Sequence, residues 1–223
     1  GSALPAITKP VVIDASTDDS FAGNGSRPAI VLQGNASILY GLQLGANADG
    51  STIRGFAFQG FTANNGAAVR IDAGSDGNIV AGNYFGTLDT NGHLAATGEN
   101  LFGISVAGSN NTIGGSTAAD RNVLAGNDTG IWLLGSGNRV IGNYIGTDAT
   151  GNVGATYGNV YSGVTISAGT GNTIGGAAAG EGNVIGGLLA QGVMIQTASS
   201  VVGTVIIGNR IGTDLAGTAS WDL

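Results

Sequence analysis

The sequence predicts an all-β fold, a right-handed parallel β-helix (β-solenoid) of about seven coils, with two coils in each sequence repeat of about 60 residues. Three observations support this prediction: motifs that return at a nearly fixed interval, short segments that alternate apolar and polar residues, and asparagine at regular turn positions. We place a single β-helix domain over residues 3–223, excised from a larger protein, and interpret residues 1–2 as an expression scar.

The repeat is read directly from recurring motifs. GNYFGT begins at Gly82, GNYIGT at Gly142 and GNRIGT at Gly208, which are 60 and 66 residues apart. NTIGG begins at Asn111 and returns 61 residues later at Asn172. Several motifs that return in the same order at nearly one period indicate structural units that stack on one another.

Short alternating segments supply the strands. AVRIDA, GISVAG, GIWLLG, GVTISA and GVMIQT begin about 30 residues apart, a spacing that fits one coil of three short strands. Alternation places every second side chain inside the coil, where stacking closes a continuous core. The inward residues predicted in this way are Val69, Ile71, Ile104, Val106, Ile131, Leu133, Val164, Ile166, Val193, Ile195, Ile113, Val140, Ile174 and Ile206.

Asparagine is the second periodic signal. The chain has 20 asparagines, and many of them fall between the predicted strands. Asparagine tolerates left-handed backbone and bonds to nearby main chain, so stacked copies at the corners of successive coils predict ladders of amide hydrogen bonds. The turn positions identified are Asn78, Asn83, Asn111, Asn138, Asn143, Asn172 and Asn209.

Composition excludes several classes of partner. The net charge is −7 and the only lysine is Lys9, so the chain lacks the clustered cations that nucleic acids require. No apolar run approaches the roughly 20 residues of a membrane span, so no membrane insertion is expected. Hydrophobic residues make up 42% and charged residues 9%, which is the opposite of the balance in disordered chains.

A family resemblance follows from the motifs NTIGG, RNVLAGN, GNYIGTDATG and the opening LPAITKPVVIDAS. These runs resemble bacterial repeats in large secreted or cell-surface proteins that have a pectate-lyase-like β-helix. The resemblance covers nearly the whole chain and implies an extracellular or cell-surface location, with a signal absent from this sequence. It also implies a structural or binding module, either a rigid spacer or an adhesin-like scaffold. The expected partners are a polysaccharide or cell-surface partner and neighbouring domains of the parent protein.

Candidate ligand-binding residues come from the GNYxGT motifs and the loops that follow them. Tyr84, Tyr144 and Arg210 occupy the same outward position, so we expect them to line up along the axis, and our hypothesis is that the two tyrosines present aromatic faces to a polysaccharide. The alternative is that the tyrosines pack beneath the neighbouring loops. Residues 88–102 and 148–162 form long loops at equivalent positions, where solenoids often bind ligands. These loops contribute His93, Tyr157 and Tyr161 to the candidate set.

Metal binding is a further hypothesis, at the acidic residue after each GT dipeptide. We expect no cofactor, with calcium as an alternative at Asp89, Asp148 and Asp214. An aspartate at such a turn is equally suited to accept hydrogen bonds from loop amides, and calcium needs six to eight oxygen ligands. A capping role therefore competes with a metal role at these positions.

An enzyme is the alternative function, namely a polysaccharide lyase or epimerase acting on an acidic polysaccharide. Such chemistry needs a base and a cation beside the substrate carboxylate. Arg70 with Asp72, and Arg139, are the candidates on exposed strand positions. Arg70 and Asp72 are two residues apart, so mutual pairing also explains them. No catalytic cluster can be assembled from the sequence, which favours a structural or binding module over an enzyme.

Overall fold

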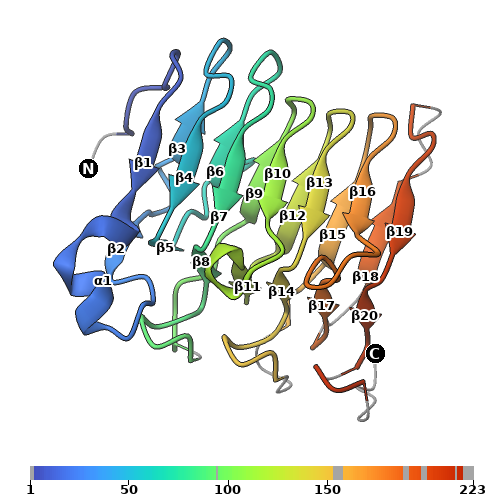
Figure 1. The fold of residues 1–223 in the computed structure, drawn as a ribbon. Helices are drawn as coiled ribbons and strands as arrows, with labels where there is room; N and C mark the ends of the chain where they lie inside the picture. The colour runs from blue at the N-terminus through green and yellow to red at the C-terminus, as the bar shows by residue number, and fades with distance from the viewer. Residues whose placement is uncertain are drawn as a thin grey trace.

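The computed structural model is a parallel β-helix in which the chain winds through about seven coils stacked along one axis (Figure 1). It describes residues 3–93, 95–152, 158–187, 191–196, 200–213 and 215–217. The expected expression scar at residues 1–2 lies outside these ranges. The prediction of an all-β parallel β-helix is confirmed.

Each coil contributes one strand to each of three parallel sheets, numbered here in the order in which the chain enters them. Sheet 1 contains β1 (Val12–Asp14), β4 (Thr52–Arg54), β7 (Ile79–Ala81), β10 (Thr112–Gly114), β13 (Arg139–Ile141), β16 (Thr173–Gly175) and β19 (Val205–Ile207). Sheet 2 contains β2 (Ile30–Gln33), β5 (Phe56–Gln59), β8 (Tyr84–Gly86), β11 (Val123–Ala125), β14 (Tyr144–Ile145), β17 (Val184–Ile185) and β20 (Arg210–Ile211). Sheet 3 contains β3 (Tyr40–Leu44), β6 (Ala67–Ile71), β9 (Phe102–Val106), β12 (Thr129–Leu133), β15 (Ser162–Ile166) and β18 (Gln191–Ile195).

Among the residues that the structure describes, helical structure is confined to three short elements. The 3-10 helix η1 (Ala15–Thr17) and the helix α1 (Asp19–Gly23) lie between β1 and β2, and the 3-10 helix η2 (Ala118–Asp120) precedes β11. Asp14 and Asp18 begin the first two helices, because their side chains accept hydrogen bonds from backbone N–H groups two residues later. None of the helices in the described ranges has the length and apolar character needed to span a bilayer.

The strand register confirms that the sequence repeat corresponds to two coils. Tyr84 on β8 pairs with Val123 on β11, and Val123 pairs in turn with Tyr144 on β14. The next step of the same repeat leads through Val184 on β17 to Arg210 on β20. Residues about 60 positions apart in sequence are therefore second neighbours along the axis.

The core runs through the centre of the coils, and the inward residues predicted on interior coils are all fully buried. The last coil differs. Ile195 on β18 is 47% exposed and Ile206 on β19 is 42% exposed, so the prediction of burial was wrong for both. Ile206 pairs with the buried Ile174, but β18 and β19 are the final strands of their sheets among the described residues. Val193 is partly buried against the core.

Three asparagine ladders run along the three corners of the coil and confirm the prediction of stacked amides. All of their members are buried except Asn209, which is partly buried. Ladder A precedes the sheet 1 strands, ladder B precedes the sheet 2 strands, and ladder C precedes the sheet 3 strands. Ladder A contains Ser51, Asn78, Asn111, Asn138 and Asn172; ladder B contains Asn83, Asn122, Asn143, Asn183 and Asn209; ladder C contains Asn100, Asn127 and Asn159.

Asn143 shows how a ladder satisfies buried polar groups. Its side-chain nitrogen donates to the carbonyl of Ile113 at 2.9 Å, and also to the Asn183 side-chain oxygen at 3.0 Å. Its backbone N–H donates to that same oxygen at 2.9 Å. Because the corner excludes water, each of these groups needs a partner within the protein. The ladders therefore fix how each coil sits on the next.

The glycine before each ladder B asparagine in the GN motifs is required by close packing. Gly142 has φ +67°, and a Cβ atom built on it would lie 1.9 Å from the carbonyl oxygen of Gly115. A side chain cannot occupy that space, and the left-handed backbone also disfavours one. The GN motif thus combines a turn that only glycine allows with the amide that links neighbouring coils.

Candidate functional site

The candidate site lies on the outer face of sheet 2. As predicted, Tyr84, Tyr144 and Arg210 lie in one column along this face, with Val123 and Val184 between them. The column runs parallel to the axis of the coil, so equivalent side chains recur at every second strand, about 10 Å apart at the usual strand spacing.

Loops cover the two tyrosines of this column. Only 6% of Tyr84 and 5% of Tyr144 is exposed. Gly92 lies against the Tyr84 ring and Gly151 against the Tyr144 ring, so equivalent loops cover equivalent residues. The rings therefore follow the alternative interpretation and pack beneath the loops. They offer no open face on which a sugar ring could stack.

Two sets of loops border the column on opposite sides. The described parts of the long loops, residues 88–93, 95–101, 148–152 and 158–161, follow sheet 2 and lie at the bottom of Figure 1. The short loops, residues 115–121 and 176–182, connect sheet 1 to sheet 2 and fold back over the preceding coil. The face between the two sets of loops is a groove.

Hollow 1 is the part of this groove beside Tyr84, with a volume of about 320 Å³. It is bounded by residues after α1, by a short loop and by both long loops. Hollow 1 brings together two residues predicted from the sequence, Tyr84 and His93, with two arginines that were not predicted, Arg27 and Arg121. Its polar lining consists chiefly of Arg27, Tyr84, Asn91, His93, Arg121 and Thr150.

Hollow 2 is the next part of the groove, beside Tyr144, with a volume of about 370 Å³. Tyr144 and Arg210, which the repeat predicts to lie in one column, both line this hollow. Arg121 lines both hollows, so the two form neighbouring sections of one surface. Both volumes lie near the lower end of the range for small-molecule sites.

Arg121 is held at the boundary between the hollows. Its guanidinium carbon lies 4.0 Å from the centroid of the Tyr144 ring, within the range of a cation–π contact. Its Nε donates to the carbonyl of Gly142 at 3.3 Å. The equivalent residue in the next short loop is Gly182, so an arginine occurs in only one of the two copies of this loop. That difference between the copies was the sequence signal available for Arg121.

Tyr84 is more than nine-tenths buried and lines hollow 1, and no hydrogen bond of its hydroxyl is found among the described residues. Burial raises the pKa of the Tyr84 hydroxyl above its ordinary value of 10.0. The nearby charge of Arg27 acts in the opposite direction on this pKa, while the carboxylates of Asp89 and Asp148 add to the increase. The hydroxyl is therefore a neutral donor at physiological pH.

Asp89 and Asp148 cap the turns of the long loops. Asp89 Oδ1 accepts the backbone N–H groups of Asn91 and His93 at 2.8 and 2.9 Å. Asp148 Oδ1 accepts those of Thr150 and Asn152 at 2.8 and 3.0 Å. The two turns are equivalent even though Asp89 comes one residue later in its motif, because the extra residue, Leu88, is buried with Tyr84 and Tyr144 in the apolar cluster on the outer face of sheet 2.

The calcium hypothesis gains no support from this geometry. No group of three or more His, Cys, Asp or Glu side chains is placed to hold a metal ion among the residues that the structure describes. Asp214, the third residue of the hypothesis, lies outside the described residues. The capping bonds of Asp89 and Asp148 match the alternative role that the sequence allowed.

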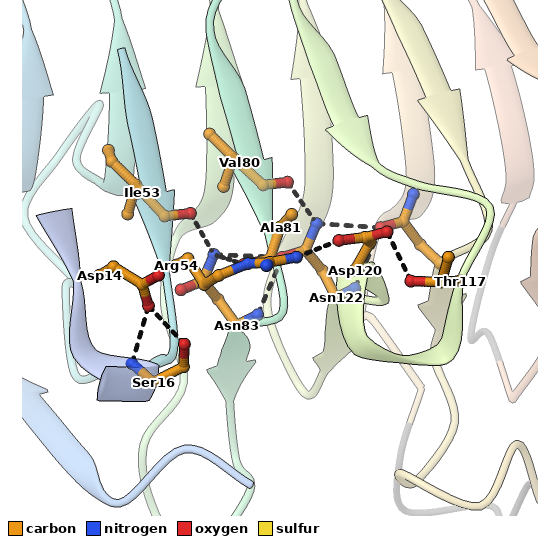
Figure 2. A network of polar contacts seen from close by, with 11 residues as sticks. Asp14, Ser16, Ile53, Arg54, Val80, Ala81, Asn83, Thr117, Asp120 and Asn122 are labelled. Carbon is orange, nitrogen blue, oxygen red and sulfur yellow. Dashed lines mark hydrogen bonds and ion pairs between the residues drawn. The ribbon is translucent and has the colours of Figure 1, made fainter. Parts of the chain in front are cut away.

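Ion pairs hold the short loops in place. Arg54 on β4 pairs with Asp120 of the first short loop, and Figure 2 shows Asp120 also bound by Thr117. Arg139 on β13 pairs with Glu181 of the second short loop at 2.8 Å. Asp120 and Glu181 occupy equivalent positions in their repeats. Arg139 therefore supports a wall of the groove.

The catalytic candidates do not converge. Arg70 Nε donates to Asp72 Oδ1 at 2.9 Å, and Arg70 Nη1 donates to Ser105 at 2.7 Å. These residues lie on the outer side of sheet 3, whereas Arg139 belongs to sheet 1. The mutual pairing of Arg70 and Asp72 matches the alternative given from the sequence.

The two remaining ligand-binding candidates are Tyr161 and Tyr157, and neither is found in a hollow of the described structure. Tyr161 is 51% exposed and precedes β15, and it lines neither hollow. Tyr157 lies outside the described residues. A second aromatic feature lies on sheet 3, where the half-buried rings of Phe102 and Trp132 stack with centroids 4.6 Å apart.

No family model, curated protein or solved structure shows significant similarity to this chain.

Proposed function

We propose that this chain is a rigid module of a secreted or cell-surface bacterial protein that binds an extended polysaccharide along the groove over sheet 2. In this role the β-helix is a structural or adhesin-like scaffold that positions neighbouring domains of the parent protein and a carbohydrate partner. The resemblance of the NTIGG and GNYIGTDATG motifs to secreted bacterial repeats supports the location.

One observation carries the proposal: hollows 1 and 2 adjoin one another along the axis of the coil, and Arg121 lines both. Their tyrosines are two strands apart, about 10 Å at the usual spacing. A polymer with repeating units can occupy such a row of sites with one binding mode, whereas a single small ligand would fill only one of them. Stacked coils joined by buried ladders give the row a fixed spacing.

The lining chemistry also suits saccharides. Sugar hydroxyls need directional donors and acceptors, and hollow 1 supplies the side chains of Asn91, Thr150 and Tyr84. The enzyme alternative has no comparable support among the described residues, because Arg70 and Asp72 satisfy each other and Arg139 is on another sheet.

Binding can be tested by affinity electrophoresis and calorimetry against neutral and charged polysaccharides. Ala118 is exposed on η2 and lines hollow 1, so Ala118→Trp should fill the hollow. The matched control is Ala73→Trp, at an exposed position after sheet 3. We expect affinity to fall at least tenfold in Ala118→Trp and to remain unchanged in the control.

Two results would overturn the proposal. One is that no polysaccharide in the panel binds to the parent chain. The other is that Ala118→Trp binds as well as the parent, while Trp132→Ala on sheet 3 abolishes binding. That outcome would move the carbohydrate site to the stacked aromatic pair of sheet 3.

A further inference from the structure

We infer that hollow 1 selects saccharide units that carry an anionic group, a carboxylate or a sulfate ester, which Arg27 and Arg121 hold together with the Tyr84 hydroxyl. The inference rests on the proposed function and deepens it by naming the ligand class.

The distribution of positive charge is the first argument. The chain has only seven lysine and arginine residues and a net charge of −7. Within the described part of the chain, ion pairs bind Arg54, Arg70 and Arg139 to carboxylates. No such ion pair is found there for Arg27 and Arg121, and both of them line hollow 1. A chain poor in cations thus places two uncompensated cations in one hollow.

Arg27 is fixed in a position suited to an anion. Its Nε donates to the carbonyl of Asn24 at 3.0 Å, and its Nη2 donates to Asn91 Oδ1 at 3.1 Å. The Asn24 side chain also donates to the carbonyl of Thr90 at 2.7 Å, so the segment after α1 is tied to the long loop. These bonds use part of the guanidinium and hold it in place, which lowers the entropy cost of binding a ligand.

Arg121 presents the second guanidinium from the opposite wall. Its Nε is occupied by the Gly142 carbonyl, while its two terminal nitrogens have no hydrogen-bond partner in the described chain. Stacking on Tyr144 restricts the orientation of the guanidinium plane. The planar pair of terminal nitrogens matches the two oxygens of a carboxylate or sulfate.

Two carboxylates that act on Tyr84 are already engaged. Asp89 and Asp148 accept two or more hydrogen bonds from the amides and hydroxyls of their own loops. These bonds offset part of their negative charge. Tyr84 lines hollow 1 and no hydrogen bond of its hydroxyl is found in the described chain, so this hydroxyl can donate to an anionic oxygen in the hollow.

The experiment compares polymers that differ in charge while their backbone stays the same. One pair is polygalacturonate and its fully methyl-esterified form, and the other is dextran sulfate and dextran. Binding is measured by calorimetry with a chelator present, so that calcium does not crosslink the uronate. Salt at about 0.15 M screens the net charge of the chain beyond about 8 Å, leaving short-range contacts to dominate.

We expect one charged polymer to bind at least tenfold more tightly than its neutral partner, and the pair that shows the preference identifies the anionic group. Arg27→Gln and Arg121→Gln should each reduce this preference at least fivefold. Lys9→Gln removes the same charge from an exposed position outside both hollows and should leave the preference unchanged. Melting temperatures of the three variants check that each one folds.

Two results separate this inference from the proposed function. If charged and neutral partners bind equally, and Ala118→Trp still weakens both, the anionic selectivity is wrong and the polysaccharide groove stands. If none of the four polymers binds and no neutral glycan in the wider panel binds, both proposals are wrong. A charge preference that survives Arg27→Gln and Arg121→Gln would also overturn the assignment to hollow 1.

Discussion

Arg54 and Asp120 form an ion pair although they are 66 residues apart and β7 lies between their coils in sheet 1 (Figure 2). Asp120 Oδ2 also accepts a hydrogen bond from Thr117 Oγ1 at 2.5 Å. The pair holds the short loop 115–121 against the side of the coil. The same loop carries Arg121 into the groove, so the ion pair positions a candidate binding residue.

Replacing Arg54 with methionine should loosen this loop without unfolding the protein. The two side chains are 28% and 30% exposed, so we expect the free energy of unfolding to fall by only about 1 kcal/mol. Amide hydrogen exchange in residues 115–121 should rise severalfold, because the loop loses an anchor. Lys9→Met is the control for loss of charge. Unchanged exchange in this loop would show that the ion pair has no positioning role.

The architecture could be predicted because its signals are local and repeated. Each coil carries its own alternating segment and its own asparagine. The stacking of Asn111 on Asn138 can therefore be predicted from the period of the sequence alone. Alternation shows which way Ile206 points, but it does not show whether another layer covers that residue. For this reason burial in the last coil was mispredicted.

The site was predicted only in part, because its contacts join segments with no fixed spacing. The alignment of Tyr84, Tyr144 and Arg210 follows from the repeat and was found. Arg27 reaches hollow 1 from the irregular segment after α1, and Arg121 occurs in only one copy of its loop. No periodic pattern marks such residues. The cover over the tyrosine rings likewise depends on how the long loops fold.

Asn143→Ala should be strongly destabilising. The substitution removes the hydrogen bonds of Asn143 to Ile113 and Asn183, and it leaves the backbone N–H of Asn122 without its acceptor in a buried corner. We expect a loss of about 3 kcal/mol in the free energy of unfolding, measured by urea denaturation. Asn64→Ala, at an exposed loop position, should change it by less than about 0.5 kcal/mol. Equal effects would argue against the ladder as a source of stability.

Gly142→Ala and Gly77→Ala separate steric contact from backbone strain. Both glycines have φ +67°, so alanine costs roughly 1–2 kcal/mol at either position. At Gly77 nothing lies within 4 Å of the added Cβ, whereas at Gly142 the Gly115 oxygen lies 1.9 Å away. We expect Gly142→Ala to be the more destabilising by at least about 2 kcal/mol in urea melts. Similar losses at the two positions would show that the coils can separate at little cost.

Tyr84→Phe should change how stability responds to alkaline pH. Burial holds the pKa of Tyr84 above 10.0 in the folded chain. Below pH 10 the hydroxyl is neutral in both states, and nothing is lost. As pH rises past 10, the unfolded chain ionises first and binds fewer protons than the folded chain, so the free energy of unfolding falls until the folded pKa is passed.

The phenylalanine variant lacks this titration, so its stability should decline less steeply between pH 9.5 and pH 11 in paired urea melts. The other four tyrosines are common to both proteins and cancel in the comparison. Identical slopes would mean that the Tyr84 hydroxyl ionises as freely in the folded chain as in the unfolded one. It would then not be enclosed by the long loop.

Ile113→Ala and Ile206→Ala compare an interior coil with the last one described. Both residues lie in the same column of sheet 1, linked through Val140 and Ile174. Ile113 is fully buried, so truncation leaves a cavity and should cost about 2–5 kcal/mol. Ile206 is 42% exposed, so the same truncation should cost less than about 1 kcal/mol in dilute protein. Urea melts at several protein concentrations measure both values. A large cost for Ile206→Ala that grows with protein concentration would contradict the expectation and show that the apolar end of the coil is covered by another molecule in solution.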